Sequence, residues 1–250
     1  MYRVILEVQV APRHQTSPHQ PPTMTNFNIQ IISDTVCPWC YVGYRRLSRA
    51  IVAHQSSYPN DTFNLGWKAF YLNPASAQFP GWNKQEWYSR KFGTERAVAM
   101  FKRLAAVGEG EGIAFKFGGN TGLTRDSHRL LWYAAQEEAK QGASSGEIGG
   151  LQTRVVEKLF AAYFENEKNI TDPRVLLEAG VEAGLNREAV EKLLDSEEGG
   201  AEVDSEAKAA ARRLVTGVPY FMVQGKYAVE GADEPETFLE IFKKVKDEEK

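Results

Sequence analysis

Two segments near the start of the chain alternate between apolar and polar residues, as strands with one buried face do. The first runs from Phe27 to Ser33 and gains β-branched residues toward its end, and the second covers residues 62–70. The two predicted strands are connected by a segment whose apolar side chains fall on one helical face, at Cys40, Tyr44, Leu47 and Ile51. This order predicts a βαβ unit with parallel strands.

The middle of the chain, residues 84–215, carries an almost wholly helical pattern. Helices are predicted at residues 94–107, 125–141, 151–163 and 173–183, in a short segment after Asn186, and at residues 201–214. The glycines at 108–112 and 118–122 are interpreted as loops, because neither group has the spacing of a phosphate-binding turn after a strand. Short joints between the helices are typical of an antiparallel helical cluster.

Strand signals return near the end of the chain. Residues 218–223 and 227–229 flank a glycine-containing turn, and an amphipathic helix begins near Pro235. The order βαβ, helical block and ββα predicts one α/β fold interrupted by a large all-helical insertion. The predicted parts are a disordered N-terminal extension (1–25), the N-terminal βαβ part of the fold (26–80), the helical insertion (81–215) and the C-terminal ββα part (216–250).

Composition narrows the classes of function. The 250 residues carry a formal net charge of −3, which disfavours nucleic acid as a partner because phosphate binding needs a strongly basic face. The apolar runs are too short to span a membrane. Residues 1–25 lack the uninterrupted apolar core of a secretory signal, so we expect a cytoplasmic protein. Two alternatives to a disordered extension remain for residues 1–25. One is a mitochondrial presequence, and the other is an upstream start codon with Met24 as the working initiator.

The two cysteines of the chain, Cys37 and Cys40, form a CxxC pair between the first strand and the first helix. Half a zinc site is one interpretation, but there is no other cysteine and the four histidines lack ligand spacing, so no metal is expected. The placement favours a thioredoxin-like redox pair. Cys37 is the expected nucleophile, because the helix N-terminus stabilises a thiolate. Cys40, one turn further, is the expected resolving thiol.

The residues around the pair have their own expected roles. Pro38 fits the first turn of the helix, because the N–H that proline lacks would be unpaired there. Trp39 adds apolar surface beside the reactive sulfur. Asp34 would oppose formation of a thiolate on Cys37 if its side chain pointed that way.

A second group of candidate residues lies far from the pair in sequence. Pro219 opens a predicted strand, and the topological position opposite the redox helix favours a cis peptide bond before it. The backbone of Val218 would then be free to pair with an extended substrate. His128 and Phe70 are the candidates for a substrate groove, although a lone histidine or an aromatic side chain at such positions is more often structural.

Five motifs resemble those of DsbA-like thioredoxin-fold proteins of the FrnE type. They are SDTVCPWCYVG at 33–43, WKAFYLNP at 67–74, TRDSHR at 124–129, GVPYF at 217–221 and YAVEGA at 227–232. They occur in order, and the resemblance covers about residues 27–245. It implies a thioredoxin fold with a helical insertion over the active site and thiol–disulfide oxidoreductase chemistry, with thiols or disulfides of proteins or of glutathione as substrates.

The resemblance also includes relatives with other activities. Kappa-class glutathione transferases and 2-hydroxychromene-2-carboxylate isomerases are similar in fold but use a serine near the position of Cys37. Both cysteines are present here, which favours dithiol chemistry with no required cofactor, while glutathione stays open as a co-substrate. Glu230 and Asp233 depart from the usual serine and glutamine of the family, so the preferred substrate is open.

Three hypotheses follow from these features. The first is a thiol–disulfide oxidoreductase that uses Cys37 and Cys40. The second is a glutathione-dependent transferase or isomerase in which Cys37 contacts the glutathione sulfur. The third is a binding protein or chaperone with an apolar groove. The sequence leaves open the direction of electron flow, and it leaves open whether the chain forms a homodimer.

Overall fold

The structure, a computed structural model, describes residues 24–140, 149–212 and 215–249. The predicted N-terminal extension (1–25), with its mitochondrial and upstream-start alternatives, therefore lies almost entirely outside the described residues. No described helix combines the length and the apolar composition needed to cross a membrane.

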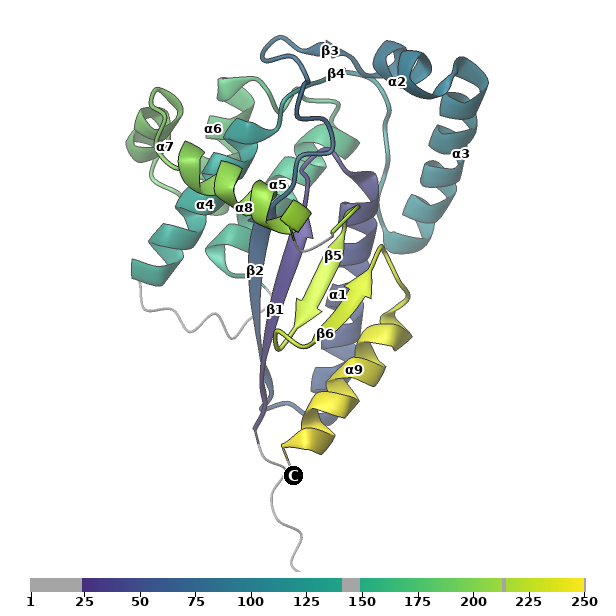
Figure 1. The fold of residues 1–250 in the computed structure, drawn as a ribbon, viewed down its shortest axis with the longest axis vertical. Coiled ribbons are helices and arrows are strands. Elements are labelled where there is room, and N and C mark those ends of the chain that lie inside the picture. The colour runs from purple at the N-terminus through teal and green to yellow at the C-terminus, as the bar shows by residue number, and fades with distance from the viewer. Residues whose placement is uncertain (1–23, 141–148, 213–214, 250) are drawn as a thin grey trace, which may run out of the picture.

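A mixed four-stranded sheet forms the centre of the fold, with strand order β2-β1-β5-β6 (Figure 1). Its strands are β1 (Asn26–Ser33), β2 (Thr62–Ala69), β5 (Tyr220–Val223) and β6 (Tyr227–Glu230). As the alternation predicts, β1 and β2 are parallel, while β5 and β6 form an antiparallel hairpin. The last strands thus reach β1 from the far end of the chain, and Ile31 pairs with both Trp67 and Phe221.

The main core lies between this sheet and two helices, α1 (Pro38–Ser57) and α9 (Pro235–Glu248). Strand residues that point to these helices are almost fully buried, and Phe27 stacks on Phe63 with ring centroids 4.7 Å apart. Phe242 from α9 packs against both rings. Burial of such large apolar side chains is the main favourable term in folding, so this layer fixes where α1 begins relative to the sheet.

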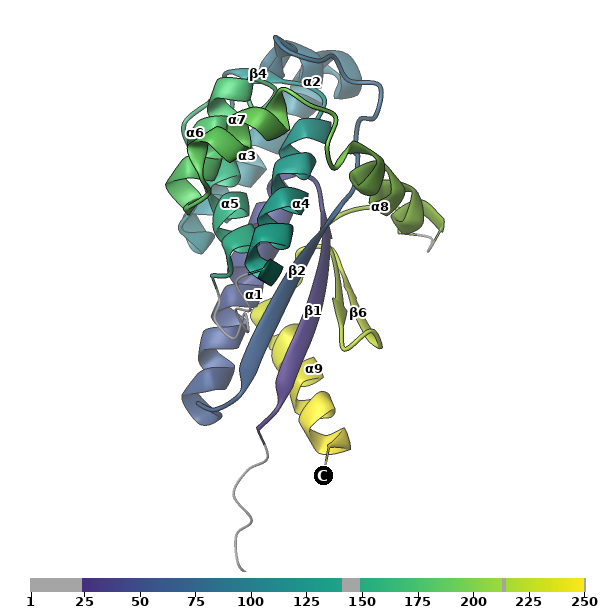
Figure 2. The same cartoon turned by 90° about the vertical axis from the view of Figure 1, so that its left-hand side faces the viewer.

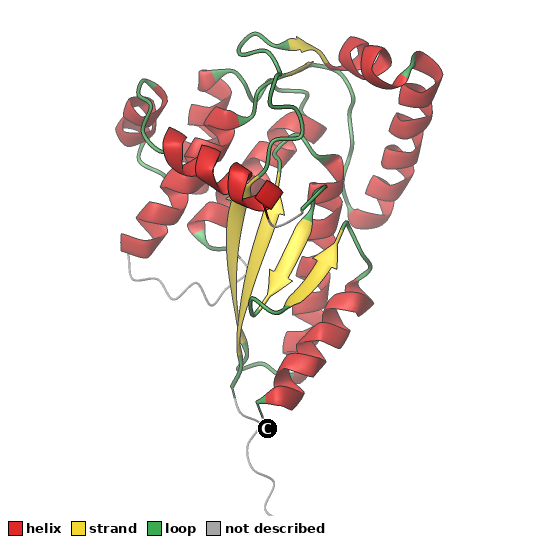
Figure 3. Cartoon of the chain, in the orientation of Figure 1, coloured by secondary structure: helices red, strands yellow, loops and turns green. Residues whose placement is uncertain are grey.

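The segment between β2 and β5 is mostly helical; one part of it lies beyond one end of the sheet, and another part packs alongside β2 (Figures 1 and 3). It contains β3 (Trp82–Asn83), α2 (Lys84–Phe92), α3 (Thr94–Glu111), β4 (Asn120–Thr121), α4 (Arg125–Lys140), α5 (Leu151–Phe160), the π-helical turn η1 (Ala161–Glu165), α6 (Pro173–Ala183), α7 (Arg187–Leu194) and α8 (Gly200–Arg212). Figure 2 shows α8 on the opposite side of β1 and β2 from α1. There Ala210 packs with Ile32 and Val215.

Two details of the insertion differ from the sequence-based prediction. The predicted loop at 108–112 is wrong, because α3 continues to Glu111. A Cβ at Gly108 would lie 2.5 Å from the Phe115 ring and 2.6 Å from the carbonyl oxygen of Ile113, so the glycine lets the following segment fold back onto the helix. The small β3–β4 ribbon, in which Trp82 pairs with Thr121, was also not predicted, because two-residue strands carry no periodic signal.

Candidate active site

Cys37 lies at the N-terminus of α1, as its N-cap residue, with an extended backbone (φ −89°, ψ 111°). Its N–H donates to the carbonyl of Asp34 at 2.9 Å, and its own carbonyl accepts from the N–H of Cys40 at 3.1 Å. Pro38 occupies the first turn as expected. Both cysteines are free thiols, and the loop after β1 thus places one sulfur where the helix dipole favours a thiolate.

The two thiols are buried but differ in their surroundings. Cys37 is 4% exposed and Cys40 is 1% exposed. Burial first, and then the hydrogen bond and negative charge of Cys37, raise the pKa of the Cys40 thiol well above its usual value. The Cys40 thiol is therefore held in its protonated form at neutral pH.

The loop before β5 meets the first cysteine. The Val218–Pro219 peptide bond is cis, and the Sγ of Cys37 lies 3.5 Å from the carbonyl oxygen of Val218, to which its S–H donates. Two segments that are far apart in the sequence are thus in direct contact at the redox sulfur. Phe70 and Val218 both pack against the cluster of Ile32, Ala210 and Val215.

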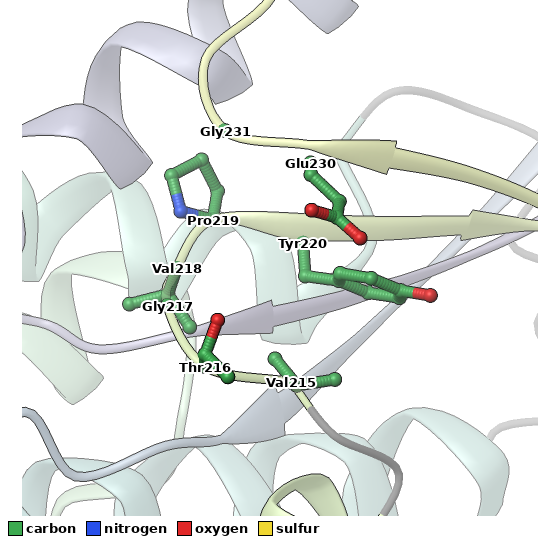
Figure 4. A pocket seen from close by; sticks show the side chains of 8 residues that line it. All are labelled: Val215, Thr216, Gly217, Val218, Pro219, Tyr220, Glu230 and Gly231. Carbon is green, nitrogen blue, oxygen red and sulfur yellow. The ribbon is translucent and has the colours of Figure 1, made fainter.

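A pocket of about 280 Å³ opens beside this loop (Figure 4). Its lining residues come from the loop, from β5 and from the end of β6: Val215, Thr216, Gly217, Val218, Pro219, Tyr220, Glu230 and Gly231. Tyr220 and Glu230 are register partners, and their side chains extend on the same side of the sheet. The pocket and Cys37 thus share Val218, which lines the pocket and accepts from the Cys37 thiol through its carbonyl.

Asp34 and His128 lie together in the interior, and Asp34 belongs to the turn at residues 34–37 that leads into α1. The carboxylate of Asp34 is fully buried. Its Oδ2 accepts from the N–H of Leu72 at 2.8 Å, and its Oδ1 lies 3.5 Å from Nε2 of His128. Nε2 lies 3.1 Å from the carbonyl oxygen of Phe70. His128, like Asp34, is buried: its exposed fraction is 3%.

The helical insertion adds three residues that the sequence did not single out. Burial first, and then the negative charges of Cys37 and Asp34, raise the pKa of the Tyr88 phenol. One turn earlier on α2, Lys84 is buried, and its ammonium donates to the carbonyl of Tyr163 at 3.1 Å. Burial lowers the pKa of Lys84 to about 8. The only signal in the sequence is the i, i+4 spacing of Lys84 and Tyr88, which indicates a shared helix face and nothing about chemistry.

Trp39 is partly buried, and the guanidinium of Arg103 from α3 lies 5.6 Å from its ring centroid. A cationic side chain over an aromatic ring stabilises the pair modestly. The insertion therefore also contacts the residue between the two cysteines. Within the ranges the structure describes, no group of three or more His, Cys, Asp or Glu side chains could hold a metal ion.

Comparisons with known proteins agree with this arrangement. The family model of the DSBA-like thioredoxin domain matches residues 28–243. A crystal structure of a probable DsbA oxidoreductase from Streptomyces coelicolor is similar at 29% identity and TM-score 0.73, over 86% of this chain and 88% of that one. Comparison with curated proteins gives no match.

Two more distant structures share the fold. A 2-hydroxychromene-2-carboxylate isomerase has 17% identity and TM-score 0.57, over 87% of this chain and 95% of that one. The cytosolic disulfide reductase DsbM from Pseudomonas aeruginosa, with GSH, has 15% identity and TM-score 0.53, over 87% and 98%. The predicted α/β thioredoxin-like fold with a helical insertion is thus confirmed.

Proposed function

Because this chain belongs to the DsbA-like thioredoxin domain family, we propose that it is a thiol–disulfide oxidoreductase of the FrnE type that exchanges a Cys37–Cys40 dithiol or disulfide with its substrates. The observation that carries the proposal is the position of Cys37 at the start of α1, with its Sγ 3.5 Å from the carbonyl of Val218. A nucleophilic sulfur at a helix N-terminus and a backbone edge for the substrate are thereby adjacent.

In the reducing direction the reaction takes two exchange steps. The Cys37 thiolate attacks one sulfur of a substrate disulfide, so a mixed disulfide forms and the other substrate sulfur leaves as a thiolate. Cys40 then loses its proton and attacks the Cys37 sulfur, which releases the second substrate thiolate. Two electrons pass to the substrate, and the Cys37–Cys40 disulfide remains until another thiol, such as glutathione, reduces it. The oxidising direction is the reverse.

The loop at 216–219 supports a docking role for Val218 and Pro219. Val218 lines the pocket, and its carbonyl, which accepts from the Cys37 thiol here, is the backbone group that an extended substrate would pair with. Trp39, which lies between the two cysteines in sequence and is partly buried, contributes apolar surface near the Cys37 sulfur. Protein disulfides and glutathione are both candidate substrates for this pocket, and no metal or nucleotide cofactor is part of the proposal. We further propose a cytoplasmic location, in which thiols are kept reduced and a reductase or isomerase role is favoured.

The redox equilibrium of the wild-type protein tests the proposal. The protein is equilibrated with glutathione buffers of graded composition, quenched with acid, alkylated and measured by mass spectrometry. The expected result is a reversible two-electron transition between the dithiol and an intramolecular Cys37–Cys40 disulfide. Failure to form this disulfide, or accumulation of only a stable Cys37–glutathione adduct, would overturn the proposal and favour a glutathione-dependent transferase or isomerase.

A further inference from the structure

The side chains of Asp34 and His128 come from two separate sequence motifs that meet in the interior, at the turn formed by residues 34–37. Asp34 is 0% exposed and His128 is 3% exposed. Nε2 of His128 lies 3.1 Å from the carbonyl oxygen of Phe70 and 3.5 Å from Oδ1 of Asp34. Because a carbonyl oxygen can only accept, Nε2 carries the hydrogen. This N–H therefore donates to the Phe70 carbonyl, while the buried Oδ1 of Asp34 lies 3.5 Å from the same nitrogen without accepting a hydrogen bond from it.

The same carboxylate is tied to the reactive cysteine through the backbone. The carbonyl of Asp34 accepts from the N–H of Cys37 at 2.9 Å, so the two residues share one tight turn. Oδ2 of Asp34 accepts from Leu72, whereas Oδ1 has no hydrogen bond of normal length among the described residues and is fully buried. A buried carboxylate oxygen without a good donor is costly, and its negative charge opposes any thiolate nearby.

The start of α4 is held against this turn by a second contact. The hydroxyl groups of Thr35 and Ser127 lie 2.7 Å apart, and both side chains are buried. Tyr71 lies beside His128 with ring centroids 5.7 Å apart, but its hydroxyl donates to Asp204 and so does not serve Asp34. His128 thus places the positive end of an N–H dipole 3.5 Å from the unsatisfied Oδ1 of Asp34.

We propose that His128 is a positioning residue for the redox reaction: the positive end of its Nε2–H dipole, 3.5 Å from Oδ1 of Asp34, partly offsets the charge of that carboxylate, and thereby sets the thiolate fraction of Cys37 and the equilibrium between dithiol and disulfide. This inference rests on the proposed function. Loss of the donor leaves the Asp34 charge less compensated beside Cys37. The thiolate, and with it the reduced form, then becomes less favourable, so the protein becomes easier to oxidise.

A double-mutant cycle between the two residues tests this inference. The variants are His128→Leu, Asp34→Asn and the combination, with His128→Gln as the conservative change, because a glutamine amide can reach the position of Nε2. The exposed Asp195 provides a matched control in Asp195→Asn. Two quantities are measured: the equilibrium constant for oxidation by glutathione disulfide, and the rate of Cys37 alkylation at neutral pH in a Cys40→Ser background, where Cys37 is the single cysteine.

We expect His128→Leu to slow alkylation and to raise the oxidation constant, each by about three- to tenfold. Asp34→Asn should act in the opposite direction, and His128→Leu should lose most of its effect in the Asp34→Asn background. His128→Gln should stay within about twofold of the wild type. Circular dichroism establishes that each variant is folded, and if His128→Leu does not fold, the cycle is run with His128→Met, which likewise lacks an N–H donor.

An effect of the His128 substitution that is the same in both Asp34 backgrounds would overturn the inference, since a role in packing alone does not depend on the carboxylate. Faster alkylation in His128→Leu would overturn it as well. Both results are separate from failure of the proposed function, which would appear in the wild-type protein as absence of the Cys37–Cys40 disulfide.

Discussion

Gly43 of α1 lies directly against Pro219 of the loop that contacts Cys37. A Cβ at Gly43 would stand 3.0 Å from Cγ of Pro219 and 3.0 Å from the Phe221 ring. Real Cβ atoms are seldom found this close to neighbouring carbons, so a larger residue would push the loop away from the helix. The absence of a side chain at this one position allows the nucleophile and the docking loop to approach each other.

Gly43→Ala should therefore weaken both stability and activity. The overlap with Pro219 and Phe221 costs about 1–3 kcal/mol, more than the roughly 1 kcal/mol that alanine gains over glycine in a helix. Urea unfolding measures the first effect, and the rate of disulfide reduction measures the second. Gly110→Ala in α3 is the matched control, because nothing lies within 4 Å of the added Cβ there. A Gly43→Ala protein as stable and active as the control would contradict the prediction.

Cys40→Ser should trap the reaction at its midpoint. Cys37 still attacks the substrate disulfide, but no thiol follows to resolve the mixed disulfide, so the adduct persists. Mass spectrometry after incubation with a disulfide substrate or with oxidised glutathione should show one substrate half bound per chain. Cys37→Ser is the control and should form no adduct. Catalytic turnover that survives in Cys40→Ser would instead support the transferase or isomerase alternative.

Lys84 should make stability depend on alkaline pH. Burial lowers its pKa from 10.5 to about 8, so between these values the unfolded chain binds a proton that the folded protein has released. The contribution of Lys84 to the free energy of unfolding therefore rises as pH increases from about 8 to 10.5, by up to about 3 kcal/mol. The Lys84→Met variant has no titrating group at this position, so it lacks this pH-dependent change in the free energy of unfolding. Its stability relative to the wild type should thus be higher at about pH 7 than at about pH 10.

Urea unfolding of both proteins at the two pH values checks this. The exposed Lys116 gives the control, since Lys116→Met should follow the wild type at both. An equal difference between Lys84→Met and the wild type at the two pH values would exclude the assigned burial of a lysine with a lowered pKa.

Asp61 links the two ends of the described chain. Its carboxylate accepts from Nζ of Lys246 at 2.7 Å, from Nε2 of His54 at 2.8 Å and from the N–H of Thr25 at 2.9 Å. Burial acts to raise the pKa of Asp61, but these hydrogen bonds, that of Lys246 first, hold it below its usual value. The stabilisation is therefore complete above about pH 4 and is lost as pH falls through the lowered pKa.

Asp61→Asn should cost about 3 kcal/mol at neutral pH, because it removes the carboxylate charge that pairs with the buried Lys246 ammonium. Chemical unfolding of the single variant and of Asp61→Asn with Lys246→Met measures this, and the second change should recover part of the loss. On the same helix, Lys243 and Asp247 form an exposed pair, so Asp247→Asn should cost less than about 1 kcal/mol. Equal costs at the two sites would contradict the prediction.

The sequence by itself determined most of the fold and the identity of the reactive pair. Alternation in β1 and β2, and the apolar stripe of α1, follow from local periodicity, which depends only on nearest neighbours in the chain. The helix signals at Asp172 and Gly184 were equally local: Asp172 accepts from the N–H of Arg174, and Gly184 adopts φ 109°. The CxxC spacing indicated its chemistry because two cysteines one helical turn apart lie close enough for their sulfurs to form a disulfide.

Tertiary structure alone decided which other residues surround the sulfur. Asp34 lies near Cys37 in sequence, but only the packing of α4 places His128 against its carboxylate. The same holds for Lys84, whose burial under Tyr163 has no counterpart in its polar, surface-like sequence context. The physical reason is that desolvation and charge depend on distances across the fold, which periodicity does not encode. A residue's type and spacing can therefore predict a nucleophile, whereas its acidity is set by neighbours that only the folded chain brings together.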